Sequence, residues 1–337
     1  MKKIFTLMLA CFCLMALHAQ QGNEHLYGVA FYNLENLFDT IHDVGKNDRD
    51  FLPDGSYQWN ATKYACKLSN MARVLAEMAR KKVPKGAALI GVAEVENRRV
   101  LDDLLEQPLL AQYNYVHYEG PDRRGIDCAL LYDPKQFKVM HSRLVLSEPY
   151  QGDTLHLTRG FLIVTGKLAG ERLSVVVNHW PSRGAQSPVR VHAARQVKAL
   201  CDSIRQADRK RKIIVMGDLN DDPMDESLRM LGTCKLASEV KNGLFYNPWW
   251  AKLEDEGEGT LLYKGKWNLF DQILMDASLM NDGNKLRFDH HEIFRAPYLF
   301  EQEGKYKGNV LRTHVGRRWM NGYSDHLPTI VYLRKGK

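Results

Sequence analysis

Short hydrophobic runs recur along the chain, and each is bounded by polar residues or glycine. The runs are rich in β-branched and aromatic residues, which is typical of buried strands. The pattern predicts strands at 26–34, 88–95, 127–133, 161–168, 173–180, 212–220, 270–276 and 327–333.

Two longer stretches, 64–81 and 188–207, repeat their apolar residues at the period of a helix and so predict amphipathic helices. The predicted strands clearly outnumber the helices. This ratio favours two sheets packed face to face with helices outside over a repeated βαβ fold. Because no proline- or glycine-rich linker divides the chain, we expect one domain from about 24 to 335. Within it, the polar and weakly periodic stretch 281–321 is expected to be a long surface excursion.

The N-terminus has the features of a secretory signal peptide. Lys2 and Lys3 precede an apolar run over 4–17, and Ala19 offers a small residue for cleavage. We therefore expect residues 1–19 to be removed and the protein to be exported to the periplasm or the extracellular space. A buried N-terminal strand or helix and a lipoprotein cleavage before Cys11 are the alternatives. No later stretch is long and apolar enough to span a membrane.

The composition is that of a globular protein, with 45% hydrophobic and 26% charged residues in 337. Loss of residues 1–19 removes two lysines and no acids, so the formal net charge falls from +7 to +5 (7 − 2). A mildly basic exported protein suits a polyanionic or phosphate-bearing partner.

Four cysteines, Cys66, Cys128, Cys201 and Cys234, lie outside the predicted signal peptide. They are widely spaced and form no CxxC pair, so no zinc site is indicated. An oxidising compartment would permit disulfides, but Cys128 and Cys201 lie in apolar periodic segments and are expected to be buried thiols.

Polar residues of similar chemistry follow the predicted strands. Two packed sheets bring the loops of one end together, so these side chains are candidates for a single site. Carboxylate and amide oxygens suit a hard divalent cation, Mg²⁺ above all, with Mn²⁺ or Ca²⁺ as alternatives. The residues are Asn33, Glu94, His179, Asp218, Asn220, Asp271, Asp325 and His326.

Each of these residues also has a purely structural interpretation. Asn33 would cap a helix that begins near Leu34, and Glu94 would point to solvent. The stretches 217–223 and 324–328 would be ordinary turns. The repetition of such residues at successive strand ends favours a shared site over this set of coincidences.

The ordered motifs FYNLENLF (31–38), VAEVEN (92–97), DCALLYDP (127–134), VVNHWPSRG (176–184), GDLNDDP (217–223), FDQILMD (270–276) and SDHLP (324–328) resemble the endonuclease/exonuclease/phosphatase superfamily. The resemblance covers about residues 27–333. It implies an α/β fold, a four-layer α/β/β/α sandwich of two packed mixed β-sheets flanked by helices. It also implies metal-dependent hydrolysis of phosphoesters.

The resemblance implies metal ligation by Asn33, Glu94 and Asp325, with Glu94 as the principal carboxylate. It makes His326 the general base and Asp271 the carboxylate that orients it, because one ring nitrogen held by a carboxylate leaves the other free to activate water.

The remaining motif residues correspond to groups around the phosphate and the water. Asp218 and Asn220 resemble the pair that positions the nucleophilic water and holds the phosphate or the metal. His179 is expected to hydrogen-bond the phosphate or protonate the leaving oxygen, with Asp127 as its orienting partner. Arg159 is similar to a phosphate-contacting arginine, the alternative being a surface charge on a strand.

Arg183 is a further phosphate candidate in the 176–184 motif, and its alternative role is to cover a loop.

Three substrate classes remain open. A secreted nuclease that cleaves DNA or RNA by in-line attack of water is favoured by export, by the positive charge, and by Arg123 and Arg124, which are suited to contact a phosphate backbone. A sphingomyelinase-like hydrolase of lipid headgroups or small phosphoesters is the alternative if the aromatic stretch 246–250 contacts a membrane rather than the core. A non-catalytic binding module is disfavoured because every chemical position is filled. No stable protein partner is indicated, and a monomer is expected.

Overall fold

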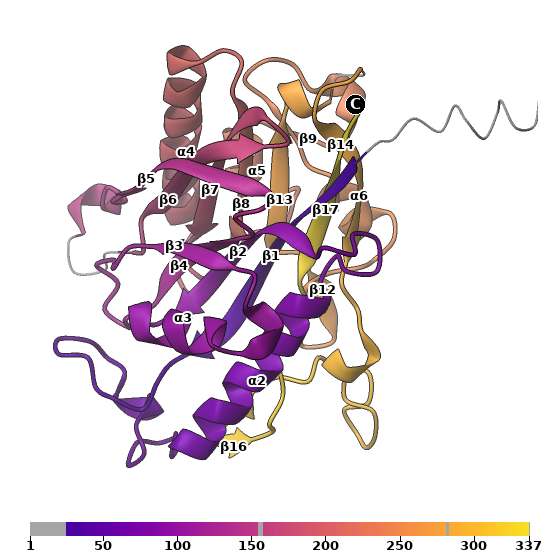
Figure 1. Cartoon of the computed structure of the whole chain (residues 1–337). Helices are drawn as coiled ribbons and strands as arrows, with labels where there is room; N and C mark the ends of the chain where they lie inside the picture. The colour runs from indigo at the N-terminus through magenta and orange to yellow at the C-terminus, as the bar shows by residue number, and fades with distance from the viewer. Residues whose placement is uncertain (1–24, 154–157, 281–282, 337) are drawn as a thin grey trace, which may run out of the picture.

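Two large mixed β-sheets form the centre of the structure, a computed structural model that describes residues 25–153, 158–280 and 283–336. One has six strands in the order β14-β17-β1-β2-β4-β3, and the other has seven in the order β5-β6-β7-β8-β13-β10-β9 (Figure 1). The predicted signal peptide at 1–19 lies outside the described residues.

The elements have the following bounds. The six-stranded sheet comprises β14 (Arg287–Ile293), β17 (Thr329–Lys335), β1 (His25–Leu37), β2 (Ala87–Val95), β4 (Asp127–Tyr132) and β3 (Asn114–His117). The seven-stranded sheet comprises β5 (Phe137–Val145), β6 (Phe161–Leu168), β7 (Glu171–His179), β8 (Lys212–Asp218), β13 (Asp271–Asp276), β10 (Phe245–Tyr246) and β9 (Thr233–Cys234). Two small hairpins pair β11 (Leu261–Tyr263) with β12 (Lys266–Asn268), and β15 (His314–Val315) with β16 (Arg318–Trp319). The α-helices are α2 (Ala61–Glu77), α3 (Arg98–Leu105), α4 (Ser187–Ala207), α5 (Glu226–Leu231) and α6 (Trp249–Glu254). The 3₁₀ helices are Arg49–Phe51, Pro108–Leu110, Tyr150–Gly152, Ala237–Glu239, Ala277–Leu279 and Pro297–Leu299.

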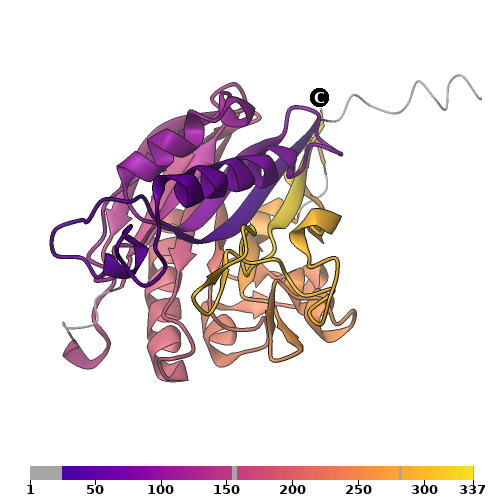
Figure 2. The same ribbon diagram turned by 90° about the horizontal axis from the view of Figure 1, so that it is seen from below.

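Strand β8 explains why the sheets stack between two layers of helices. Its side chains alternate between faces, so Ile214 and Met216 pack in the core between the sheets. Ile213 and Val215 pack on the other face, in a second cluster with Val197 of α4. In Figure 2 the violet helix α2 lies along one side of the sheets and the pink helix α4 along the opposite side. The predicted four-layer α/β/β/α sandwich is confirmed.

The two predicted helices correspond to α2 and α4. Helix α2 begins a few residues before the predicted start, because the Asn60 side chain accepts a hydrogen bond from the Lys63 amide and caps the helix. It ends at Glu77, short of the predicted end, because the chain turns at Ala79 (φ 60°) towards β2. Helix α4 has almost the predicted bounds and carries Pro188 in its first turn.

The prediction of a surface excursion over 281–321 is wrong in part. Residues Arg287–Ile293 form β14, which pairs with β17 at the edge of the six-stranded sheet. Most of its side chains are only half-buried, so the strand needs no apolar alternation and is hard to recognise from sequence.

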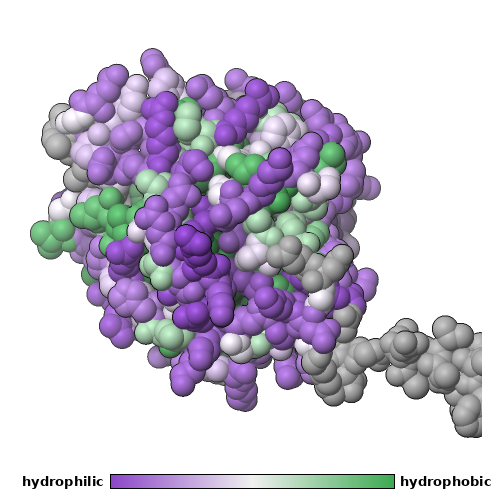
Figure 3. All heavy atoms as spheres, turned by 90° about the horizontal axis from the view of Figure 1, so that it is seen from above, coloured by the Kyte–Doolittle hydropathy of each residue, from purple (hydrophilic) through white to green (hydrophobic). Residues whose placement is uncertain are grey.

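The four described cysteines are free thiols, and Cys128 and Cys201 are buried as predicted. Among the described residues, no helix is long and apolar enough to cross a membrane. Figure 3 shows a face of the molecule covered mainly by hydrophilic residues, with the hydrophobic ones in smaller groups between them.

His291 makes the stability of the fold sensitive to acid. Burial, followed by the charge of Lys252, lowers the pKa of His291 from 6.5 to about 4, and its Nε2 atom is buried without a hydrogen-bond partner. Between these two values the unfolded chain binds more protons than the folded one, so acid destabilises the fold. We expect the wild type to lose on the order of 1–2 kcal/mol from this residue between pH 7 and pH 5.

In the wild type the ring centroids of His291 and Trp249 are 5.1 Å apart. The variant His291→Phe keeps an aromatic ring beside Trp249 but removes the titrating group. Urea unfolding at both pH values should therefore show a smaller acid-induced loss in the variant. An equal loss in both proteins would contradict this role for His291.

Candidate active site

Strand pairing places three candidate residues side by side at one end of the seven-stranded sheet. His179 ends β7 and lies opposite Asp218, the last residue of the parallel strand β8. Asp271 begins β13 and lies opposite Asp218 on its other side. A buried row of His179, Asp218 and Asp271 results from the strand register alone.

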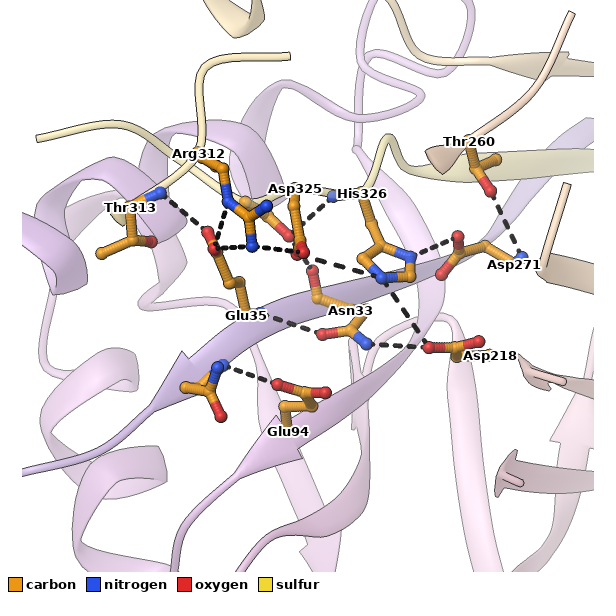
Figure 4. Close-up of polar contacts among 12 residues, drawn as sticks. Asn33, Glu35, Glu94, Asp218, Thr260, Asp271, Arg312, Thr313, Asp325 and His326 are labelled. Carbon is orange, nitrogen blue, oxygen red and sulfur yellow. Dashed lines mark hydrogen bonds and ion pairs between the residues drawn. The ribbon is translucent and has the colours of Figure 1, made fainter. Parts of the chain in front are cut away.

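His326 joins this row from the loop before β17. Its Nδ1 atom lies 2.7 Å from Oδ2 of Asp271, and its Nε2 atom lies 3.8 Å from Oδ2 of Asp218 (Figure 4). The Ser324 hydroxyl accepts a hydrogen bond from the His326 amide (3.1 Å), which holds the loop in place. Because Asp271 accepts from Nδ1–H, the other ring nitrogen faces the centre of the site.

Asn33 links the two sheets across the site. Its side-chain amide donates to Oδ2 of Asp218 (3.0 Å), and its backbone oxygen accepts from the Ser324 hydroxyl (2.7 Å). Its Oδ1 accepts from the backbone amide of Glu35 (2.9 Å). The interpretation of Asn33 as a helix cap is wrong, because β1 continues to Leu37.

Glu94 enters the site from β2 through an irregularity in the strand. The β2–β4 register shifts between Ala93 and Val95, and Glu94 has φ 62°, an uncommon value for a residue with a side chain. Its Oε2 accepts from the Asn36 amide (2.9 Å), and its Oε1 lies 3.2 Å from the Arg124 guanidinium. Glu94 therefore does not point to solvent, and the bulge directs its carboxylate inward.

The two carboxylates have opposite pKa shifts. Burial alone would raise the pKa of Glu94, but nearby positive charge, above all that of Arg124 and also that of Arg159, outweighs it and lowers the pKa to about 2. Burial raises the pKa of Asp218 to about 7 despite the charge of His326, and the neighbouring charge of Asp271 adds to the rise. Glu94 is thus ionised at neutral pH, whereas at Asp218 the positive charge of His326 offsets the effect of burial only in part.

The two histidines also differ. Burial, followed by the charge of Arg159, lowers the pKa of His179 well below its usual value, so its neutral form is favoured. Burial acts in the same direction on His326, but Asp271 and Asp218 outweigh it and raise the pKa of His326 well above the usual value. His179 is a neutral hydrogen-bonding group, and His326 is the more basic one.

The donor set fits a hard divalent cation. Glu94, Asp218 and Asp325 bring carboxylates to the site, and Asn33 adds an amide oxygen. Asn33 and Asp218 are buried, whereas the Glu94 and Asp325 side chains are partly exposed. One side-chain atom each from Asp218, Asp271 and His326 lies within 4.8 Å of the others. Because Asp271 already holds His326, the oxygen-rich side around Glu94 is the better place for a cation.

Asp325 lies at the edge of the site and is tied to a network that the sequence did not reveal. Its Oδ2 lies 2.8 Å from the Arg312 guanidinium, which also contacts Oε1 of Glu35 (3.0 Å). Lys67, buried in α2, donates to the Thr313 hydroxyl (2.7 Å). Two signals were available, namely the position of Glu35 two residues after Asn33 and a lysine on the apolar face of a helix.

Burial raises the pKa of Glu35 to about 7, and the charge of Asp325 adds to the rise. Burial lowers the pKa of Lys67 to about 8, although the charge of Glu35 opposes the shift. The side chains of this network position the loop that carries Asp325 and His326.

Arg159 lies beside the site rather than on an open surface. Its side chain is only 12% exposed, and its Nε lies 3.5 Å from Oδ2 of Asp122. Its charge contributes to the pKa shifts of both Glu94 and His179. The alternative of a surface charge on a strand is wrong.

Asn220 mainly shapes the turn after β8. Its backbone amide donates to Oδ1 of Asp218 (3.0 Å), its side-chain amide donates to the Trp180 carbonyl (3.0 Å), and its φ is 51°. Residues 217–223 therefore form the expected turn and also belong to the site, because this turn fixes the side chain of Asp218.

Asp127 does not orient His179, contrary to our expectation. Its Oδ2 lies 3.3 Å from Nε2 of His117 and accepts from the Gly120 amide (3.1 Å). Nδ1 of His179 is buried without a hydrogen-bond partner among the described residues. The strand register sets Asp127 opposite Val95, at the far side of the Glu94 bulge. His117, Glu119 and Asp127 form a second group with potential metal ligands.

Arg183 covers a loop and is not placed to contact phosphate. Its Nη2 lies 3.0 Å from Asp222 and 2.8 Å from Asp225, and its guanidinium stacks over the Phe270 ring at 4.4 Å. These carboxylates hold the guanidinium on the 217–225 segment.

Comparisons with known proteins concern the family and the fold. A sequence model of the endonuclease/exonuclease/phosphatase family matches residues 28–335. Among the curated proteins, none matches the chain.

Solved structures show the same fold at low identity. The D. rerio TDP2 complexed with a single-strand DNA product has 15% identity and a TM-score of 0.55, covering 91% of this chain and 98% of that one. The mannosyl-6-phosphatase of Bacteroides thetaiotaomicron VPI-5482 has 16% identity and a TM-score of 0.57, with 91% and 99% covered. ANGEL2, a 2′,3′-cyclic phosphatase, has 14% identity and a TM-score of 0.61, with 93% and 96% covered.

Proposed function

The chain belongs to the endonuclease/exonuclease/phosphatase family, and we propose that it is a divalent-cation-dependent phosphodiesterase that cleaves nucleic acid. The observation that carries the proposal is the convergence of a His326–Asp271 pair, His179 and an ionised Glu94 on Asp218 at one end of the sandwich. This set supplies a base, a hydrogen-bond donor and a cation ligand within one small volume.

His326 is proposed to take the proton from the attacking water. Asp271 accepts its Nδ1–H at 2.7 Å and fixes the ring, so Nε2 is directed at the space beside Asp218. The carboxylates of Asp271 and Asp218 stabilise the positive charge that the ring carries once Nε2 has taken the proton. Asp218, held by Asn33 and by the turn of Asn220, would orient the same water.

His179 and Arg159 are proposed to bind the phosphate from the other side. Nε2 of His179 lies 3.6 Å from Asp218 and 3.9 Å from Glu94, and the neutral ring can donate to a phosphate or leaving oxygen. Arg159 adds a positive charge nearby. Asn33, Glu94 and Asp325 would hold Mg²⁺, with Mn²⁺ or Ca²⁺ as substitutes. When bound, the cation would neutralise charge that develops on the phosphate oxygens.

A nucleic acid is the preferred substrate class because four arginines line a neighbouring cavity, and one of them, Arg124, lies 3.2 Å from Glu94. The solved relatives named above differ in their substrates, so they do not select one. The lipid alternative loses its main support, because Trp249 is buried and donates to the Ile273 carbonyl (3.0 Å) instead of forming a membrane-contacting aromatic surface.

Metal removal tests the proposed function. Protein treated with a chelator should lose activity on bis-p-nitrophenyl phosphate, plasmid DNA and RNA, and Mg²⁺ or Mn²⁺ should restore it. Sphingomyelin and a phosphomonoester should be poor substrates in the same panel. Activity that survives chelation would contradict the cation role, and turnover of sphingomyelin or the monoester alone would contradict the nuclease assignment.

We further propose that the protein is exported and acts as a monomer. Export is supported by Lys2, Lys3 and the apolar run in the predicted signal peptide. Mass spectrometry of the secreted or periplasmic fraction should find an N-terminus near residue 20, and a full-length cytoplasmic chain would contradict the proposal.

A further inference from the structure

A cavity of about 810 Å³ lies next to the candidate active site, and four arginines line it: Arg49, Arg123, Arg124 and Arg159. We propose that this arginine pocket binds a second phosphate group of a phosphodiester strand, beside the phosphorus centre at Glu94. The proposal rests on the proposed function and deepens it, because it assigns the enzyme a polyanionic strand rather than an isolated phosphoester.

The pocket is connected to the catalytic residues. Arg124 lines the pocket and lies 3.2 Å from Oε1 of Glu94. The lining also includes Pro181 and Ser182, which follow Trp180 after the end of β7 at His179. A nucleic acid with one phosphate at Glu94 and His179 would therefore continue into this pocket.

The positive charges that line the arginine pocket outnumber its negative charges. Four arginines and two carboxylates, Asp50 and Asp122, give the lining residues a net charge of +2 (4 − 2). One of these carboxylates, Asp122, pairs with Arg159. Arg49 and Arg123 are exposed and make no side-chain ion pair with any described residue. Unpaired guanidinium groups beside a cavity are suited to bidentate contact with phosphate oxygens.

The arginine-bearing segments are fixed to each other. The Lys46 ammonium donates to the carbonyls of Gly120 (3.0 Å) and Asp122 (2.9 Å), and the Asn47 amide donates to the Arg123 carbonyl (2.7 Å). These bonds join the segment before Arg49 to the loop that carries Arg123. The backbone positions of the two arginines are therefore fixed relative to each other. The volume also exceeds the space that one phosphate needs and falls within the range of ligand pockets.

The test compares a substrate that has one phosphorus centre with one that has many. The double variant Arg49→Ser/Arg123→Ser is measured on bis-p-nitrophenyl phosphate and on a short single-stranded oligonucleotide. We expect kcat/KM on the oligonucleotide to fall by about 100-fold, or about tenfold for each arginine, because a hydrogen bond to a charged group is lost. The rate on bis-p-nitrophenyl phosphate should stay within about twofold, and the salt dependence of strand cleavage should become shallower.

Arg209→Ser is the matched control. Arg209 is exposed and precedes the first residue of β8, whereas Asp218 is the last residue of that strand. Arg209 is therefore far from the site along β8, and its loss should leave both rates unchanged. Equal losses of the double variant on both substrates, or no loss on the oligonucleotide, would overturn the subsite. A wild type that cleaves neither substrate would instead overturn the proposed function.

Discussion

Replacing His326 by alanine is expected to lower kcat on bis-p-nitrophenyl phosphate by about 10³-fold, within the usual range for loss of a general base. The reason is geometric, because Nε2 of His326 is the only imidazole nitrogen held toward Asp218 by a carboxylate on the other ring nitrogen, among the described residues. Steady-state kinetics at saturating Mg²⁺ measures the effect.

The companion variant Asp271→Asn should also lose activity, because an amide no longer selects the same tautomer of His326. His192→Ala, a partly exposed position on α4, is the control and should be fully active. Circular dichroism and the melting temperature establish that each variant is folded. Near-normal turnover of folded His326→Ala would remove His326 from the mechanism.

Replacing Glu94 by glutamine is expected to lower kcat/KM by about 10²–10³-fold and to weaken the apparent affinity for Mg²⁺. Glutamine has nearly the same shape, so the loss reports the carboxylate charge. The low pKa of Glu94 means that this charge is present throughout the neutral range, and Arg124 and His179 are arranged around it.

Calorimetric titration with Mn²⁺ separates the two parts of this expectation. Glu94→Gln should bind Mn²⁺ more weakly than the wild type, whereas Glu106→Gln, an exposed position after α3, should bind it as the wild type does. Unchanged Mn²⁺ affinity in Glu94→Gln would contradict the assignment of Glu94 as the principal ligand.

The predicted strands and the two long helices could be recognised because their buried faces require a regular pattern of apolar residues in the sequence. In β8 the residues on both faces are apolar, since one face meets the other sheet and the other meets α4. The strand β14 lies at the edge of its sheet, and most of its side chains are half-buried. Its sequence therefore lacks a regular pattern of apolar residues. Hence it was missed.

The site residues that end paired strands could also be predicted, because position along the strand determines position in the sheet. His179, Asp218 and Asp271 are the clearest case. Partners that depend on loops could not. Asp127 contacts His117 instead of His179, and Arg183 is held by the carboxylates of its own loop.

The Glu35–Lys67 network depends on contacts between α2, β1 and the segment before β17, which lie far apart in the sequence. Long-range contacts of this kind leave no periodic signal in a single sequence.

We propose that Glu94, Asp218, His179 and His326 surround one cation site. The most direct test is an anomalous difference map from a crystal of the protein grown with Mn²⁺. We expect a peak at about 2.0–2.3 Å from a carboxylate oxygen of Glu94, within reach of Asn33 or Asp325. A peak only at the His117, Glu119 and Asp127 group, or none near Glu94 at a Mn²⁺ concentration that supports catalysis, would contradict it.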